Sequence, residues 1–138
     1  MNDRIKTALI ITEDLNTKSF LRKTLGNLYH LIETEKLENV LSIAENTKID
    51  LVIIDNVIDP SLEIPFQLKK RKKLFTVPII LITSNLKKSF KEKAIKAGVF
   101  DFLYSPIREE ELKLVLKKCE NEQNVISKTS AVSSKIKQ

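Results

Sequence analysis

Three short apolar runs constrain the fold of this chain more than any other feature. They span residues 8–11, 51–54 and 79–82, and each is followed by a polar residue. An uninterrupted apolar run of this length is typical of a strand that is buried on both faces of a parallel sheet. Shorter strand patterns at residues 30–34 and 102–104 complete an expected set of five strands.

Amphipathic segments separate these runs. In two of them the apolar residues recur at i, i+3, i+4 and i+7, which indicates helices with one buried face. The residues are Leu37, Val40, Leu41 and Ala44 in the first segment, and Leu112, Val115, Leu116 and Cys119 in the second. Helical patterns also occur between residues 16 and 28, from Pro65 to about residue 73, and up to Ala97. Strands that alternate with helices predict an α/β domain whose parallel sheet is covered on both faces.

This domain is expected to cover residues 1–120. Beyond it, the apolar stripe of the last helix gives way to Ser, Lys, Thr and Gln. We therefore expect residues 121–138 to form a flexible tail or the start of a linker to an effector domain.

Composition argues against several classes of protein. The net charge is +6, and the basic run at residues 69–73 is the best sign of an anionic partner. Arginine and interleaved aromatic residues, which would contact and stack on bases, are scarce, so we expect a solvated helix end and no nucleic-acid binding. No apolar run approaches the roughly 18 to 20 residues of a membrane span. The one cysteine, Cys119, cannot form an internal disulfide, which favours a cytoplasmic protein.

Polar side chains follow the apolar runs at the ends of the expected strands. Glu13 and Asp14 come after the first run, Asp55 directly after the second, and Thr83 after the third. In an open parallel sheet, ligands bind at the carboxyl ends of the strands. With the strand order 2-1-3-4-5, the strands that carry these residues are neighbours, so the side chains are expected to converge.

Carboxylates that converge in one shallow cleft repel one another unless they take up a proton or bind a cation. A site made only of oxygen ligands suits Mg²⁺. With its charge neutralised, a carboxylate such as Asp55 can act as a nucleophile toward a phosphoryl donor, and the Thr83 hydroxyl is placed to donate to the transferred group. A strand-terminal acid that merely caps a turn is the alternative.

Several stretches of the chain resemble the receiver domains of bacterial two-component response regulators, over residues 4 to about 120. They are residues 11–14, Leu51 through Asp55, residues 77–84, and residues 97–103 followed by Ser105-Pro106-Ile107. The resemblance implies a flavodoxin-like (βα)5 three-layer sandwich with a five-stranded parallel sheet in the order 2-1-3-4-5.

The resemblance also implies a role for single residues. Asp55 would be the phosphorylated aspartate, Thr83 the switch hydroxyl and Phe102 the switch aromatic. Four residues would hold Mg²⁺: Asp14 and Asp55 directly, Glu13 through water, and Val57 through its carbonyl. A histidine kinase or phosphotransfer protein would supply the phosphoryl group. Helix four, strand five and helix five would form the responding face and a homodimer interface. Such a protein is a signalling switch that self-phosphorylates at most, and not a metabolic enzyme.

The chain departs from the family in two places. Ser105 occupies the position of a lysine that would pair with the acyl phosphate, and a hydroxyl cannot supply that charge. In the loop after Asp55, the proline at position 60 comes one residue late and no glycine follows it. These departures favour a second hypothesis, a pseudo-receiver that acts as a phosphorylation-independent interaction or dimerisation module. A basic nucleic-acid-binding domain is the third and remotest alternative.

Overall fold

The computed structural model describes the backbone from residue 4 to residue 136 and side-chain surroundings as far as residue 123. Five parallel strands form one sheet in the order β2-β1-β3-β4-β5. The strands are β1 (Lys6–Ile11), β2 (Tyr29–Thr34), β3 (Leu51–Asp55), β4 (Ile79–Thr83) and β5 (Asp101–Tyr104). The predicted fold class and strand order are confirmed.

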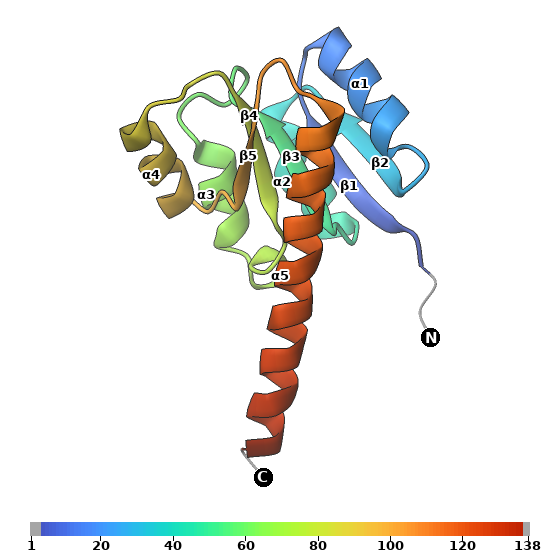
Figure 1. The fold of residues 1–138 in the computed structure, drawn as a ribbon, viewed down its shortest axis with the longest axis vertical. Coiled ribbons are helices and arrows are strands. Elements are labelled where there is room, and N and C mark those ends of the chain that lie inside the picture. Colours follow the sequence, from blue (N-terminus) through green and yellow to red (C-terminus); the bar gives the residue numbers. More distant parts are fainter. Residues whose placement is uncertain (1–3, 137–138) are drawn as a thin grey trace.

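Helices cover both faces of this sheet and make three layers (Figure 1). They are α1 (Leu15–Leu25), α2 (Leu37–Asn46), α3 (Glu63–Lys69), α4 (Lys88–Lys96) and α5 (Glu109–Ile136), with a short 3₁₀ turn, η1 (Lys72–Leu74). Buried residues of α1 and α5 pack on one face of the sheet, and those of α2, α3 and α4 pack on the other.

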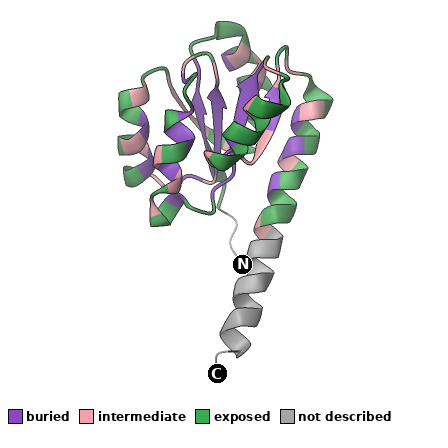
Figure 2. Cartoon of the chain, turned by 90° about the vertical axis from the view of Figure 1, so that its left-hand side faces the viewer, coloured by how far each residue is buried: buried purple, intermediate pink, exposed green. Residues whose placement is uncertain are grey.

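Alternate residues of the central strands serve the two cores. In β1, Leu9 and Ile11 join the core under α2, α3 and α4, whereas Ala8 and Ile10 join the core under α1 and α5. Successive side chains of a strand point to opposite faces, so both faces must be apolar if both are covered. Full burial of one aliphatic side chain contributes about 1.5 to 3 kcal/mol. Figure 2 shows the result, with buried strands between helices whose outer faces are exposed.

Helix α3 begins before the proline at which the sequence pattern placed it. It starts at Glu63, with Pro65 inside its first turn. The buried Asp59 carboxylate accepts hydrogen bonds from the backbone N–H groups of Glu63 (3.1 Å) and Ile64 (2.9 Å). The first N–H groups of a helix have no acceptor within the helix, and Asp59 supplies that acceptor here.

Helix α5 continues into the segment for which a flexible tail or a linker was expected. It runs for 28 residues to Ile136, so residues 121–136 are helical. Figure 1 shows its last turns extending past the sheet. Helix propagation costs little once a packed nucleus exists, and loss of the apolar stripe does not end a segment that lacks glycine and proline. Residues 137 and 138 lie outside the described residues, and the linker to an effector domain stays a prediction.

We predict that Asp59→Ala lowers the free energy of unfolding by about 2 kcal/mol, since the backbone N–H groups of Glu63 and Ile64 lose their acceptor. Asp59→Asn keeps one acceptor oxygen in place and should lose less. Chemical denaturation followed by circular dichroism measures both values. Equal stability of Asp59→Ala and the unaltered chain would contradict the role of Asp59 as the cap of α3.

Candidate functional site

The parallel register brings the ends of β1, β3 and β4 to one edge of the sheet. Ile11 of β1 pairs with Ile54 of β3, and Asp55 of β3 pairs with Ile82 of β4. The residues that follow β1 therefore lie beside the last residue of β3 and the last residue of β4. This arrangement is the one that places ligand sites at the carboxyl ends of parallel strands.

A cleft of about 450 Å³ opens at this edge. It is lined by Glu13, Asp14, Thr17, Asp55, Val57, Ile58, Ile82, Thr83, Ser84 and Ser105. Every residue predicted for the site lines the cleft except Phe102. Glu13 and Asp14 are exposed, whereas Asp55 is only 8% exposed and Thr83 4% exposed. The structure therefore brings the predicted residues together, with Asp55 at the floor of an open cleft.

The Asp55 carboxylate has one hydrogen-bond donor on each oxygen. The Thr12 hydroxyl donates to Oδ2 (2.8 Å), and the Val57 N–H donates to Oδ1 (3.1 Å). The Thr12 oxygen also accepts from the Asp14 N–H (3.1 Å), so one buried hydroxyl connects Asp14 to Asp55. Sequence reasoning missed Thr12. Its one signal is a hydroxyl residue between an apolar run and two acids.

Asp14 caps helix α1 in this structure. Its Oδ2 accepts hydrogen bonds from the Thr17 hydroxyl (2.7 Å) and the Thr17 N–H (2.8 Å). These bonds, the hydroxyl first, lower the pKa of the Asp14 carboxyl below its ordinary value, against a small opposing effect of burial. Asp14 therefore has a structural role here, as the residue that caps the N-terminus of α1.

The acids share the cleft without meeting at one point. Within the described part of the chain, no three acidic, histidine or cysteine side chains lie close enough to hold a metal ion. The donor set nevertheless suits Mg²⁺, which prefers a few carboxylates and other oxygen ligands. Asp14 would have to exchange its bonds to Thr17 for a metal, and its exposure at the rim of the cleft leaves room for that rotation.

The Thr83 hydroxyl already has a donor and an acceptor as neighbours. It donates to Oδ1 of Asn56 (2.9 Å) and accepts from the Asn85 N–H (3.1 Å). The sequence did not point to Asn56. Hydrophobic periodicity does not show that the side chain after Asp55 contacts the end of β4.

Phe102 lies apart from the cleft. It is 4% exposed and belongs to the core under α2, α3 and α4. Its ring stacks on Tyr104 with centroids 6.1 Å apart, and the Lys91 ammonium lies 5.9 Å from its centroid. A side chain in this place can respond to the cleft only through movement of β5 and α4.

Ser105 lines the cleft but leaves it without a positive charge. Its N–H donates to the Thr83 carbonyl (3.1 Å). None of the described residues that line the cleft is a lysine or an arginine. Lys87, the nearest lysine to follow β4 in the sequence, is exposed and is not among the lining residues.

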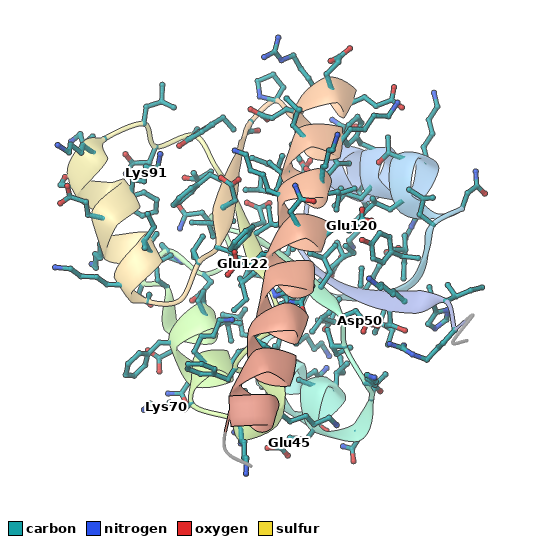
Figure 3. The ribbon with its side chains drawn as sticks, turned by 60° about the horizontal axis from the view of Figure 1, so that its bottom comes forward. Glu45, Asp50, Lys70, Lys91, Glu120 and Glu122 are labelled. Atoms are coloured by element: carbon teal, nitrogen blue, oxygen red, sulfur yellow. The ribbon has the colours of Figure 1, made fainter. Side chains whose placement is uncertain are left out.

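The basic run at residues 69–73 contacts the protein itself. The Lys69 ammonium donates to the carbonyls of Phe75 (3.0 Å) and Val77 (2.6 Å), and burial lowers its pKa. Lys70 lies over the Phe66 ring, 4.2 Å from its centroid. Arg71 pairs with Glu45 of α2 at 2.7 Å. Figure 3 shows Lys70 and Glu45 toward the lower end of the view. These contacts weigh against a nucleic-acid interface there.

Comparison with known proteins identifies a family and similar folds for this chain. A family model for the response regulator receiver domain matches residues 8–117. Histidine kinase P4 of Formosa agariphila is 25% identical over 121 residues, which are 85% of this chain and 9% of that protein. The chain thus spans about a tenth of that curated relative.

Two solved structures are similar over nearly their whole length. Chemotaxis protein CheY4 of Vibrio cholerae matches with a TM-score of 0.77 at 17% identity, over 84% of this chain and 99% of that one. The receiver domain of sensor histidine kinase PA1611 from Pseudomonas aeruginosa matches with a TM-score of 0.72 at 19% identity, over 83% of this chain and 97% of that one. That structure has a magnesium ion coordinated in its active site cleft. In the described residues of this chain, no helix is long and apolar enough to cross a membrane.

We predict that Thr17→Val raises the pKa of the Asp14 carboxyl toward its ordinary value of 3.8, because the hydroxyl bond that lowers it is lost. Thr17→Ser keeps the hydroxyl and should keep the lowered pKa. A pH titration of the side-chain carboxyl by ¹³C NMR measures both.

The same bond links pH to stability. The charged form of Asp14 is favoured in the folded protein, so its contribution is present above pH 3.8 and is lost as the pH falls through the lowered folded-state pKa. Identical titration curves for Thr17→Val and the unaltered chain would contradict the assignment of Thr17 as the donor.

Proposed function

The chain belongs to the response regulator receiver domain family, and on this premise we propose that Asp55 is the residue that accepts a phosphoryl group in two-component signalling. The observation that carries the proposal is the placement of the Asp55 carboxylate, which is mostly buried at the end of β3 and still lines the open cleft. Glu13 and Asp14 stand beside it at the rim. A strand-terminal acid that only capped a turn would not need two further acids around a common cavity.

The hydrogen bonds of Asp55 suit a nucleophile. Thr12 and the Val57 N–H hold one carboxylate oxygen each and so fix the plane of the carboxylate. An oxygen of Asp55 would attack the phosphorus of a phosphohistidine, the P–N bond would break, and its electron pair would leave with the imidazole, which takes up a proton. The product is an acyl phosphate on Asp55. Fixed orientation of the attacking group lowers the entropic cost of such a step.

Mg²⁺ would be held directly by the carboxylates of Asp14 and Asp55 and by the Val57 carbonyl, and Glu13 would act through water. When bound, it would offset the negative charge that accumulates on the phosphoryl oxygens. The oxygen-rich lining of the cleft supports this assignment, as does the magnesium ion in the similar receiver domain from Pseudomonas aeruginosa. Asp14 would leave Thr17 to join the ion, which makes metal binding compete with the cap of α1.

The remaining residues of the cleft would read the modification. The Thr83 hydroxyl, at the end of the neighbouring strand, would donate to a phosphoryl oxygen. Its movement would be passed to Phe102 and to the face formed by α4, β5 and α5, where a homodimer or another partner would dock. A histidine kinase or phosphotransfer protein would be the donor. The protein would then be a signalling switch and not a metabolic enzyme.

Incubation with a small phosphodonor and Mg²⁺ tests the central claim. We expect intact-mass measurement to find one phosphoryl adduct on the unaltered chain and none on Asp55→Asn, which has no nucleophilic oxygen. Asp14→Asn should give less adduct, because a metal ligand is weakened. If neither the small donor nor a cognate kinase gives an Asp55-dependent adduct, the proposal fails.

A lysine at position 105 should strengthen the chemistry. We expect Ser105→Lys to raise the yield or lifetime of the adduct by on the order of tenfold, because a charge-assisted hydrogen bond to the phosphoryl group is worth about 1.5 to 3 kcal/mol. Ser105→Met adds comparable length without charge and is the control. The two variants are compared by the decay of the adduct over time. Equal lifetimes would show that the missing charge does not limit this site.

The second candidate function is a pseudo-receiver, a phosphorylation-independent interaction or dimerisation module. Two observations favour it: Asp14 is occupied as a helix cap, and the described lining of the cleft has no basic side chain. The mass measurement separates the candidates, since a pseudo-receiver has the fold and no adduct.

A further inference from the structure

The Thr83 hydroxyl is not available to a ligand in this structure. A hydroxyl has one proton to donate, and here that proton goes to Oδ1 of Asn56 at 2.9 Å. Its oxygen accepts from the Asn85 N–H at 3.1 Å. Thr83 is 4% exposed, so water does not freely replace these partners. Any group on Asp55 that is to receive the Thr83 proton must take it from Asn56.

The orientation of the Asn56 amide is fixed from its other side. Its Nδ2 donates to the Asp59 carbonyl at 3.4 Å. A carbonyl can only accept, so the NH₂ group faces Asp59 and the amide oxygen faces Thr83. The backbone is fixed as well, because the Asn56 N–H donates to the Ile82 carbonyl at 2.8 Å.

The residue that holds the Asn56 amide is itself buried and hydrogen-bonded. Asp59 is 2% exposed and is held by the two N–H groups at the start of α3. The Asn56 amide oxygen that faces Thr83 is thus held in place by two bonds of Asn56, one to the buried Asp59 and one to Ile82 at the end of β4. Asn56 is also the residue between Asp55 and Val57, so a change at its side chain reaches both proposed ligands through the backbone.

We propose that Asn56 is a positioning residue that restrains the Thr83 hydroxyl in the unmodified protein. The inference rests on the proposed function. A phosphoryl oxygen on Asp55 carries charge and accepts a stronger hydrogen bond than the neutral amide oxygen of Asn56. Transfer of the Thr83 hydrogen bond from Asn56 to the phosphoryl oxygen is therefore favourable. The free energy gained is reduced by the loss of the bond to Asn56. Asn56 sets how strongly a phosphoryl group must bind before Thr83 moves.

Removal of this restraint should raise the affinity of the cleft for a phosphoryl group. In Asn56→Ala, the Thr83 hydroxyl has no side-chain acceptor to leave, so a phosphoryl group or its mimic should bind more tightly. A net neutral hydrogen bond corresponds to about a three- to tenfold change in affinity. If Asn56 acts through Thr83, the gain must vanish when the hydroxyl is absent.

Beryllofluoride, a phosphoryl mimic formed from beryllium and fluoride salts, provides the test in the presence of Mg²⁺. Its affinity is measured by NMR titration for the full chain and for Asn56→Ala, alone and combined with Thr83→Val or Thr83→Ser. We expect Asn56→Ala to bind three- to tenfold more tightly than the unaltered chain. The same gain is expected when Asn56→Ala is added to Thr83→Ser, and no gain is expected when it is added to Thr83→Val. Asn56→Ser, whose side chain is too short to reach Thr83, is measured in parallel in case Asn56→Ala folds poorly.

Each result is decisive. Unchanged or weaker binding by Asn56→Ala and Asn56→Ser overturns the inference while the proposed function stands. A gain that persists with Thr83→Val overturns it too, because Asn56 would then act by another route. Failure of the unaltered chain to bind beryllofluoride contradicts the proposed function itself, and the inference with it.

Discussion

Two-sided burial of β1, β3 and β4 is the constraint on which the rest of this structure depends. Each of these strands has a helical layer on both faces, so each side chain points into one of two cores. This packing fixes the register of each strand against its neighbours. That register aligns the ends of the three strands, and the polar residues that terminate them then have nowhere to lie except along one edge. The cleft follows from the core. A shift of one strand by one residue would bury an acid and dismantle the site together with the packing.

The cleft that results is unbalanced in charge. Its described lining holds three carboxylates and no basic side chain, so it attracts cations and opposes an added phosphoryl group unless a cation is present. The polar groups meanwhile have local partners: Asp14 accepts from Thr17, Asp55 from Thr12 and the Val57 N–H, and Thr83 donates to Asn56. Each partner is a neutral group that a stronger, charged ligand can displace.

Hydrogen-bonded and packed groups connect the cleft to β5 and α5. The Ser105 N–H is bonded to the Thr83 carbonyl, and Phe102 lies three residues before it on β5 with its ring in the core. This backbone hydrogen bond joins the end of β4 to the residue that follows β5. At the other end of the molecule, the Gln123 amide donates to the Thr76 carbonyl at 2.6 Å and ties α5 to the segment before β4. Helix α5 then continues past the sheet (Figure 1).

The sequence by itself determined the strands, the alternation with helices, the sheet order through its family resemblance, and the acids at the strand ends. These follow from local periodicity and from the position of a residue relative to an apolar run. Only the tertiary structure decided that Thr12 holds Asp55, that Asn56 holds Thr83, that Asp59 caps α3 and that Asp14 caps α1 without joining a metal cluster. It also showed that the segment expected to be a tail or linker is helical up to Ile136. The physical reason is that periodicity reports which face is buried, whereas a hydrogen-bond partner is chosen among all the donors and acceptors that folding brings near.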